Sequence, residues 1–312
     1  MLLYADKSFK LLSLLLGLCL SLSLSAQHAP VNAQYLSNAL PMNPAFSGSR
    51  EALSIALTYR NQWSAIDGAP VTQTLAIHSP TKNEKLAFGL LVYRDAIGVS
   101  KKNAFMANMA YRVKLGAGKL AFGLSGGMVM QSNEWSKVHT TGLELDEVFT
   151  GGDDRFNLPD FGAGVYYSTQ QWFVSLSAPS LMQHKYAGGQ SYDAQFDMAS
   201  TSVFGAIGAR LKLNRNLKLQ PSVLLRSLAG QPQQFDFNLI ANYNEILEIG
   251  VSYRTSNAFL SLMRYHLNGQ FALAYSNEIE IGTYNSYFRM SHEITLTYDL
   301  IFKTNSTSPK FF

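Results

Sequence analysis

The feature that most constrains the fold is a two-residue alternation of apolar and polar side chains that recurs along the chain. Its clearest instance is HEITLTYDLIF, residues 292–302. The apolar face there carries Ile294, Leu296, Tyr298, Leu300 and Phe302, and the other face carries Glu293, Thr295, Thr297 and Asp299. Successive side chains of an extended strand point to opposite faces, so this pattern predicts a β-strand with one apolar and one polar face.

Fourteen segments show this alternation, many of them with aromatic residues near one end. They are residues 51–60, 71–78, 85–94, 104–113, 118–135, 160–169, 172–178, 202–213, 217–226, 234–243, 246–254, 257–266, 270–277 and 291–302. Most are close to the 9–11 residues that a tilted strand needs to cross a bilayer. The even count is typical of bacterial transmembrane barrels. The sequence therefore predicts an all-β fold, an antiparallel transmembrane barrel of about 14 strands.

The connections between these segments alternate in length. Those after even-numbered segments are short, and include 170–171, 214–216, 244–245 and 268–269. Those after odd-numbered segments are mostly longer, and include 136–159, 179–201 and 278–290, although 255–256 is short. Outer-membrane barrels have short periplasmic turns and longer extracellular loops, so the pattern favours that class of protein.

A soluble β-sandwich would also alternate, with one buried and one solvated face. Three features favour the membrane barrel, and the first is that the alternating segments end in aromatic residues. Charged residues make up only 15% of the chain, against about a quarter in a typical soluble domain. Many expected inward positions are small or uncharged and polar (Ser54, Thr58, Thr72, Thr74 and Asn108). Closure into a barrel also leaves no sheet edge unpaired in lipid.

The N-terminus reads as a secretory signal peptide over residues 1–26. Lys7 and Lys10 precede the apolar run 11–24, and Ser25-Ala26 supplies small residues before a cleavage site. The only cysteine, Cys19, would leave with this peptide, so we expect a mature chain without disulfides or thiolate sites. We divide the remainder into a periplasmic lead-in (27–50), the outer-membrane barrel (51–302) and a polar C-terminal tail (303–312).

No motif for catalysis, a cofactor or a metal stands out. The histidines lack the spacing of a zinc site, and no Gly-x-Ser-x-Gly elbow is present. The stretch GGDDRFNLPDF, 151–161, could offer oxygen ligands to Ca²⁺ from Asp153, Asp154 and Asp160, but lacks regular spacing and is better explained as a solvated extracellular loop. A net charge of +4 without a dense basic run argues against a nucleic-acid partner.

Arginines recur near the ends of the segments: Arg60, Arg94, Arg112, Arg210, Arg226, Arg254 and Arg264. A lipid-facing arginine at the membrane midplane costs roughly 2–4 kcal/mol, so these residues should face the lumen or lie at the rims. In the lumen they would give anion selectivity or pack against acidic residues of a plug, whereas at a rim they would do neither.

The stretch NPAFSGSREALSIALTYRNQWSAIDGAPVTQ, 43–73, resembles the N-terminal signature of the PorP/SprF family, outer-membrane proteins of type IX secretion and gliding in Bacteroidetes. The matching residues are Asn43, Pro44, Ala45, Gly48, Arg60, Gln62, Trp63, Gly68, Ala69, Pro70 and Thr72. The C-terminal Ser291-His292-Glu293-Ile294 and the blocks AFGL (121–124) and PDFGAGVYYS (159–168) are similar to further family blocks. The resemblance thus spans nearly the whole mature chain.

This resemblance implies a non-enzymatic accessory of the secretion machine that supports export or surface attachment of cargo. Its expected partners are machine subunits, cargo C-terminal regions and outer-membrane lipid. The signature residues would serve barrel closure or partner docking: Gly48 in a turn, Trp63 and Tyr59 as membrane-interface aromatics, and Arg60 paired in the lumen. His292 and Glu293, adjacent in a strand, should point to opposite faces. A small-solute channel or transporter, or an enzyme with a serine, a histidine and an acid at one rim, remains the alternative.

Overall fold

A computed structural model describes residues 35, 38–137, 153–188, 191–196, 201–227, 231–281 and 290–301. Two short 3-10 helices, η1 (Pro44–Phe46) and η2 (Trp135–Lys137), accompany the strands. The strands are β1 (Leu53–Asn61), β2 (Val71–Pro80), β3 (Leu86–Ile97), β4 (Ser100–Leu115), β5 (Gly118–Asn133), β6 (Asp154–Ser168), β7 (Trp172–Ala178), β8 (Met182–Gly188), β9 (Ser191–Phe196), β10 (Val203–Ala209), β11 (Leu211–Lys212), β12 (Leu217–Ser227), β13 (Gln234–Tyr243), β14 (Leu247–Arg254), β15 (Ala258–His266), β16 (Phe271–Glu280) and β17 (Ser291–Leu300).

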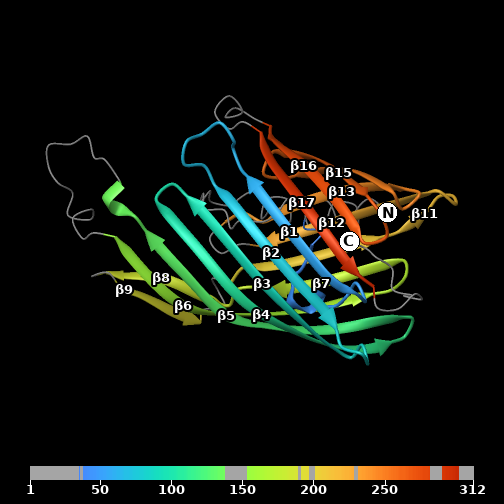
Figure 1. The fold of residues 1–312 in the computed structure, drawn as a ribbon, viewed down its shortest axis with the longest axis horizontal. Coiled ribbons are helices and arrows are strands. Elements are labelled where there is room, and N and C mark those ends of the chain that lie inside the picture. The colour runs from blue at the N-terminus through green and yellow to red at the C-terminus, as the bar shows by residue number, and fades with distance from the viewer. Residues whose placement is uncertain are drawn as a thin grey trace, which may run out of the picture.

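The strands close into an antiparallel barrel (Figure 1). Each wall strand pairs with its sequence neighbours, and closure comes from β1 pairing with β17 and from β10 pairing with both β7 and β12. The short strands β10 and β11 both pair with β12 and act as one wall strand, interrupted at Arg210. Within the described residues this gives fourteen wall strands, and each matches one of the fourteen predicted segments. The predicted fold class is confirmed.

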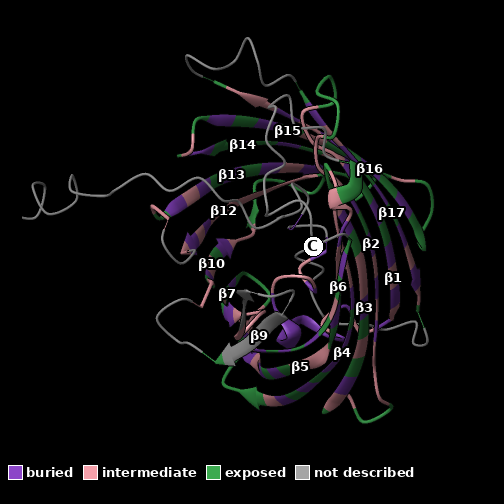
Figure 2. Ribbon diagram, turned by 90° about the vertical axis from the view of Figure 1, so that its left-hand side faces the viewer, coloured by how far each residue is buried: buried purple, intermediate pink, exposed green. Residues whose placement is uncertain are grey.

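Buried and exposed residues alternate along the wall strands (Figure 2), because successive side chains of a strand point to opposite faces. In β17, Glu293 and Thr295 are 1% exposed and face the lumen, whereas Ile294 between them is 50% exposed and faces outward. Strand β13 repeats the pattern, with Asp236 fully buried and Phe237 half exposed. The sequence alternation therefore assigned these faces correctly, with polar residues inside and apolar residues outside.

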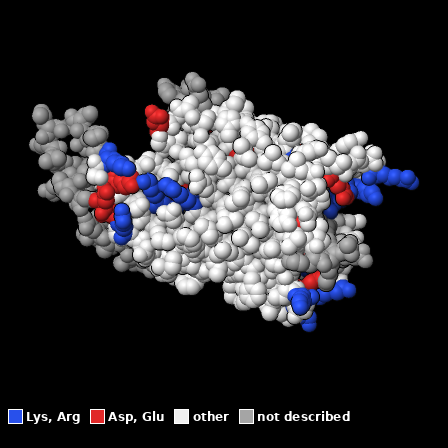
Figure 3. Space-filling model, in the orientation of Figure 1, with Lys and Arg blue, Asp and Glu red and all other residues white. Residues whose placement is uncertain are grey.

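The outer surface carries a broad apolar band. Large side chains such as Leu57, Phe88 and Leu124 are each at least half exposed, which would be anomalous over such an area on a soluble monomer. Figure 3 shows charged residues gathered at the two ends of the barrel, with an almost uncharged surface between them. This distribution is that of a barrel wall in contact with lipid. No helix among the described residues is long and apolar enough to cross a bilayer.

The two ends of the barrel differ. The end formed by connections 81–85, 116–117, 169–171, 213–216, 244–246 and 267–270 is called the turn end here, and the opposite one the loop end. Outward aromatics lie near both: Tyr111, Trp172, Tyr243 and Tyr265 toward the turn end, and Tyr59, Tyr253, Phe259 and Tyr275 toward the loop end. Two such girdles mark the membrane interfaces of an outer-membrane barrel.

Several connections differ from the sequence predictions. Strands β3 and β4 continue to a tight turn at 98–99, where Gly98 has a φ of +54°, so 95–103 is mainly strand rather than loop. This is a second short connection at the loop end, besides 255–257. Strand β6 begins at Asp154, so most of the predicted loop GGDDRFNLPDF is strand. The predicted loop 179–201 contains the hairpin β8–β9.

Candidate functional site in the plugged lumen

The described part of the expected periplasmic lead-in lies inside the barrel. Residues 38–50, called the plug here, are mostly buried, with Ala45 and Ser47 at 0% exposed and Phe46 at 2%. The plug packs against inward-facing alanines of the wall, including Ala56, Ala76 and Ala121. Small wall residues leave room in the lumen, and the irregular segment fills it. The predicted signal peptide (1–26) and tail (303–312) lie outside the described residues.

The signature residues Asn43, Pro44 and Ala45 form the centre of the plug. Asn43 caps η1, since its side-chain oxygen accepts from the Ala45 N–H at 2.8 Å. Its Nδ2 donates to the Val165 carbonyl at 3.1 Å and to Ser175 Oγ at 2.8 Å, which fastens the plug to β6 and β7. One asparagine thus shapes the short helix and attaches it to the wall.

Two wall residues that face this helix are glycines. A Cβ at Gly123 in β5 would lie 2.0 Å from the Ala45 nitrogen, and a Cβ at Gly164 in β6 would lie 2.1 Å from Asn43 Oδ1. Only glycine permits this close approach of backbone to backbone. Gly123 lies in AFGL and Gly164 in PDFGAGVYYS, so three separate blocks of the family resemblance meet at one place.

The C-terminal part of the plug is held by charged and aromatic wall residues. The Gly48 N–H donates to His78 Nδ1 at 3.0 Å, and Arg112 donates to the Ser47 carbonyl. Arg50, the last residue of the plug, pairs with Asp299 of β17 at 2.8 Å. Gly48 has a φ of +66°, as its predicted turn position requires.

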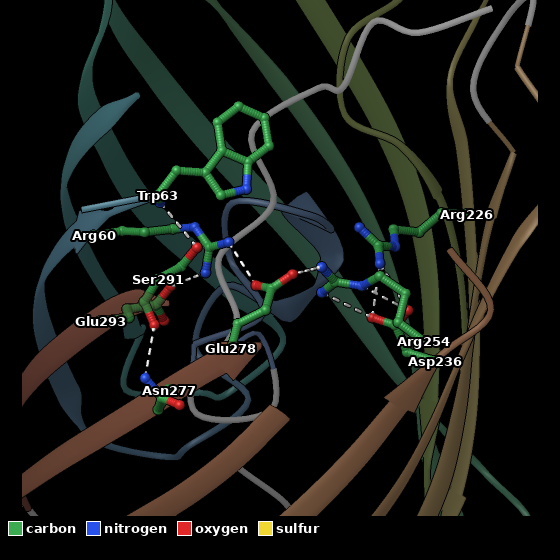
Figure 4. Close-up of polar contacts among 9 residues, drawn as sticks. All are labelled: Arg60, Trp63, Arg226, Asp236, Arg254, Asn277, Glu278, Ser291 and Glu293. Atoms are coloured by element: carbon green, nitrogen blue, oxygen red, sulfur yellow. Dashed lines mark hydrogen bonds and ion pairs between the residues drawn. The ribbon is translucent and has the colours of Figure 1, made fainter. Parts of the chain in front are cut away.

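A second cluster crosses the lumen near the loop end, and we call it the ion-pair network (Figure 4). Arg60 of β1 contacts Glu278 at 2.6 Å and Glu293 at 3.4 Å. Arg254 bridges Glu278 to Asp236, to which it lies at 3.1 Å, and Arg226 contacts the same aspartate at 2.7 Å. The six groups come from β1, β12, β13, β14, β16 and β17.

The network is balanced in charge, with three arginines against three carboxylates, and all six side chains are at most 8% exposed. Buried ions are tolerated only when they are paired in this way. Of the seven arginines considered above, Arg60, Arg112, Arg226, Arg254 and Arg264 are buried in the lumen, Arg210 is intermediate and Arg94 is exposed. The lumen arginines of this network thus pair with acids of the wall rather than with acids of the plug.

Tyr35, which precedes the plug in the sequence, lies beside this network. The Tyr35 hydroxyl lies 2.5 Å from Asn238 Nδ2, which donates to it, and Asn238 is two residues from Asp236 in β13. Burial raises the pKa of Tyr35 above its ordinary value, so the hydroxyl stays neutral. Tyr35 therefore lies near the network, whereas Arg50 lies near the turn end, where it pairs with Asp299.

The remaining signature residues lie at the loop-end rim. Trp63 has a φ of +50°, and its N–H donates to Ser291 Oγ at 3.1 Å. Its side chain interacts with the carboxylate of Glu280. Its indole lies near Arg60, at one end of the network (Figure 4), so Trp63 is not the membrane-interface aromatic that we expected. Gln62 donates to the Pro70 carbonyl, and Gly68 accepts from Gly98, which fixes the connection to the β3–β4 turn.

His292 and Glu293 separate as predicted. Glu293 faces the lumen and Arg60, whereas the His292 ring packs outward with Tyr275, whose hydroxyl lies 2.7 Å from Nδ1. The structure thus brings the signature residues together in two groups, the plug and the rim, rather than in one site. Sequence reasoning missed Glu278, because the predicted strand stopped at residue 277, although the alternation continues through Glu280.

The aspartates considered as calcium ligands bind protein donors instead. Asp154 accepts from the Trp135 indole N–H at 2.8 Å, Asp153 from Ser136, and Asp160 from the Phe161 backbone. Across the described ranges no group of histidine, cysteine and acidic residues is arranged to hold a metal.

Comparisons with known structures show outer-membrane barrels. A FadL homologue from Pseudomonas aeruginosa shares 10% identity, with a TM-score of 0.50 over 88% of this chain and 100% of that one. Omp33 of Acinetobacter baumannii, an outer membrane protein, shares 9% identity over 80% and 99% at a TM-score of 0.48. The toluene transporter TodX of Pseudomonas putida shares 12% over 85% and 94% at 0.47. At these identities the likeness concerns the fold alone.

Comparison with curated protein sequences gives no significant match. The model of one family, described as type IX secretion system membrane protein PorP/SprF, matches residues 24–298. This match covers most of the chain and includes the plug, the wall and the rim. Together with the barrel fold it places the protein in the outer membrane, and the chain belongs to the PorP/SprF family of type IX secretion membrane proteins.

Proposed function

We propose that the protein is a non-enzymatic accessory of the type IX machinery, which supports export or surface attachment of cargo proteins and does not itself conduct a solute. The observation that carries this proposal is the plug. The plug occupies the lumen and is fastened at Asn43, Gly48 and Arg50 to four wall strands, β2, β6, β7 and β17.

The alternative, a channel or transporter for a small solute, fits this lumen less well. Between the plug and β7, β10 and β12 the structure leaves a cavity of about 30 Å³, which is room for a few waters at most. Toward the loop end, the ion-pair network crosses the lumen with balanced charge, which disfavours selective attraction of anions or cations. A planar-bilayer recording discriminates, because the proposal requires a silent barrel and a transporter requires solute-responsive conductance.

A catalytic role is also disfavoured, because the buried acids of the network are already paired with arginines. Glu278, Glu293 and Asp236 each accept from arginines, so their oxygens are engaged rather than directed at a bound substrate. Ion pairs of this kind hold wall strands together around the plug. We infer that they supply rigidity.

We further infer that a periplasmic subunit of the machine docks at the turn end, which faces the periplasm if short turns do so here as in other barrels. A cleft of about 650 Å³ opens at this end beside the point where the plug enters β1. Its lining contains Lys85, Arg112, Lys114 and Lys119 against Glu51 and Glu84. This excess of basic residues favours a partner that presents an acidic surface.

Exposed Lys85 and Lys114 allow a direct test. A double variant, Lys85→Glu with Lys114→Glu, should insert normally but recover much less of the machine subunits in a pull-down of the intact barrel from its native membrane. Arg215→Glu, an exposed charge in the turn before β12, is the matched control and should recover them as wild type does. Equal recovery with the double variant and with wild type would contradict docking at this cleft.

A further inference from the structure

A groove of about 440 Å³ crosses the outward face of β17, β1, β2 and β3. It lies between two rows of side chains that the strand register places side by side. One row is Leu296, Leu57, Leu75 and Val92, and the next row toward the loop end is Ile294, Tyr59, Gln73 and Arg94. The groove is therefore part of the lipid-facing wall and not of the lumen.

The two rows differ in chemistry. The row nearer the middle of the wall is entirely apolar, whereas the row nearer the loop end finishes in Gln73 and Arg94, both exposed. Along β3 the outward residues are Phe88, Leu90 and Val92 before Arg94, so this arginine marks the boundary of the apolar band. It makes no ion pair with any residue in the described part of the chain.

An outward arginine without an acidic partner at this boundary needs an anion from its surroundings. A wall that faces lipid receives lipid headgroups at the edge of its apolar band and acyl chains below it. A ligand that binds both rows has a hydrocarbon chain that lies in the groove and a phosphate that binds the guanidinium of Arg94. A guanidinium forms charge-assisted, bidentate hydrogen bonds with phosphates.

We propose that this groove is a specific site for a phosphorylated lipid of the outer leaflet. One acyl chain lies between the two rows, and a headgroup phosphate binds Arg94, with Gln73 and the Tyr59 hydroxyl as further donors. The assignment to the outer leaflet rests on the orientation proposed above, with the loop end outside. Lipid A, whose sugars carry phosphates, is the chemical class that fits.

Native mass spectrometry of the purified full-length barrel with lipid A tests the proposal. Arg94→Gln should weaken binding of one lipid A molecule by at least about tenfold, because the variant loses the charge-assisted, bidentate hydrogen bonds to the phosphate. Arg155→Gln removes another exposed arginine, on β6 and away from the groove, and should leave that binding unchanged. Leu75→Trp, which fills the groove without changing charge, should weaken binding as Arg94→Gln does.

Several results would overturn the proposal. Equal losses in Arg94→Gln and Arg155→Gln would mean general charge attraction without a site. Unchanged binding in Leu75→Trp would mean that the groove is not occupied. Equal affinity for phosphatidylglycerol would assign the site to any anionic lipid and not to the outer leaflet. None of these measurements depends on secretion, so the lipid site and the secretion role can fail independently.

Discussion

Gly123→Ala should release the plug without damage to the barrel wall. The new Cβ would lie 2.0 Å from the Ala45 nitrogen and 2.3 Å from its Cα, where ordinary contacts begin at 3.4 Å. The helix η1 must therefore retreat by about 1.4 Å, the difference between 3.4 and 2.0 Å. The groups it meets are backbone, so no side-chain rotation can relieve the clash.

The energetic cost falls on plug docking. Overpacking costs about 1–3 kcal/mol, and the two hydrogen bonds of Asn43 Nδ2 to β6 and β7 contribute about 1 kcal/mol each. The sum, about 3–5 kcal/mol, should raise the population with a released plug by a factor of at least about 100. Pairing of β5 with β4 and β6 is untouched, since the new methyl points into the lumen.

Cysteine labelling measures this release. Because the only cysteine is Cys19, in the predicted signal peptide, a Ser47→Cys background offers one reporter at a position that is 0% exposed. Gly123→Ala in this background should raise the maleimide labelling rate about 100-fold, with unchanged heat-modifiable mobility of the barrel. Gly269→Ala, where a Cβ meets nothing within 4 Å, is the control. A rate within twofold of the background would refute the docking of the plug on Gly123.

Three further predictions concern the wall and the loop end. Arg254→Met should lower the free energy of unfolding in urea by about 3–5 kcal/mol, because Asp236 and Glu278 lose a buried partner; a loss below 1 kcal/mol would contradict the network. Leu57→Arg, on the lipid face, should lower the free energy of unfolding by about 2–4 kcal/mol, whereas Leu57→Met should lower it by under about 1.5 kcal/mol. Equal losses in the two variants would contradict the outward assignment of Leu57. Hydrogen bonds from Lys101 and Lys137 lower the pKa of Glu134 to about 2. The contribution of Glu134 to order at the loop end is therefore full above about pH 4.5 and is lost as the pH falls toward 2. Limited proteolysis near η2 should accelerate between about pH 4.5 and 2 and should not change between about pH 5 and 7.

The wall could be predicted from the sequence because its rule is local. In β17 and β13 the face that a residue occupies follows from whether its position in the strand is odd or even. Because the outer face contacts lipid and the inner face is polar, the two sets of positions also differ in residue type. The same rule failed where strands leave the membrane. Asp95 and Lys102 are opposite each other in the register of β3 and β4, beyond the apolar band, so the alternation fades although the strands continue to the turn at Gly98.

The plug could not be predicted because its contacts are not periodic. Asn43, Pro44 and Ala45 were expected in a periplasmic lead-in to β1, and their partners Gly123 and Gly164 lie far along the chain within strands. A glycine in a strand indicates close approach of something, without saying of what. Similarly, the lumen position of Arg60 could be predicted, but its contact with Glu278 depends on closure of the barrel between β1 and β17, which brings β16 near.

The most direct test of the central claim, that this barrel supports type IX export, is the secretome and surface proteome of a strain that lacks the gene. We expect type IX cargo to accumulate inside the cell and to disappear from the surface and medium, with restoration by the wild-type gene. Unchanged release of cargo and unchanged surface adhesins in the deletion strain would contradict the account.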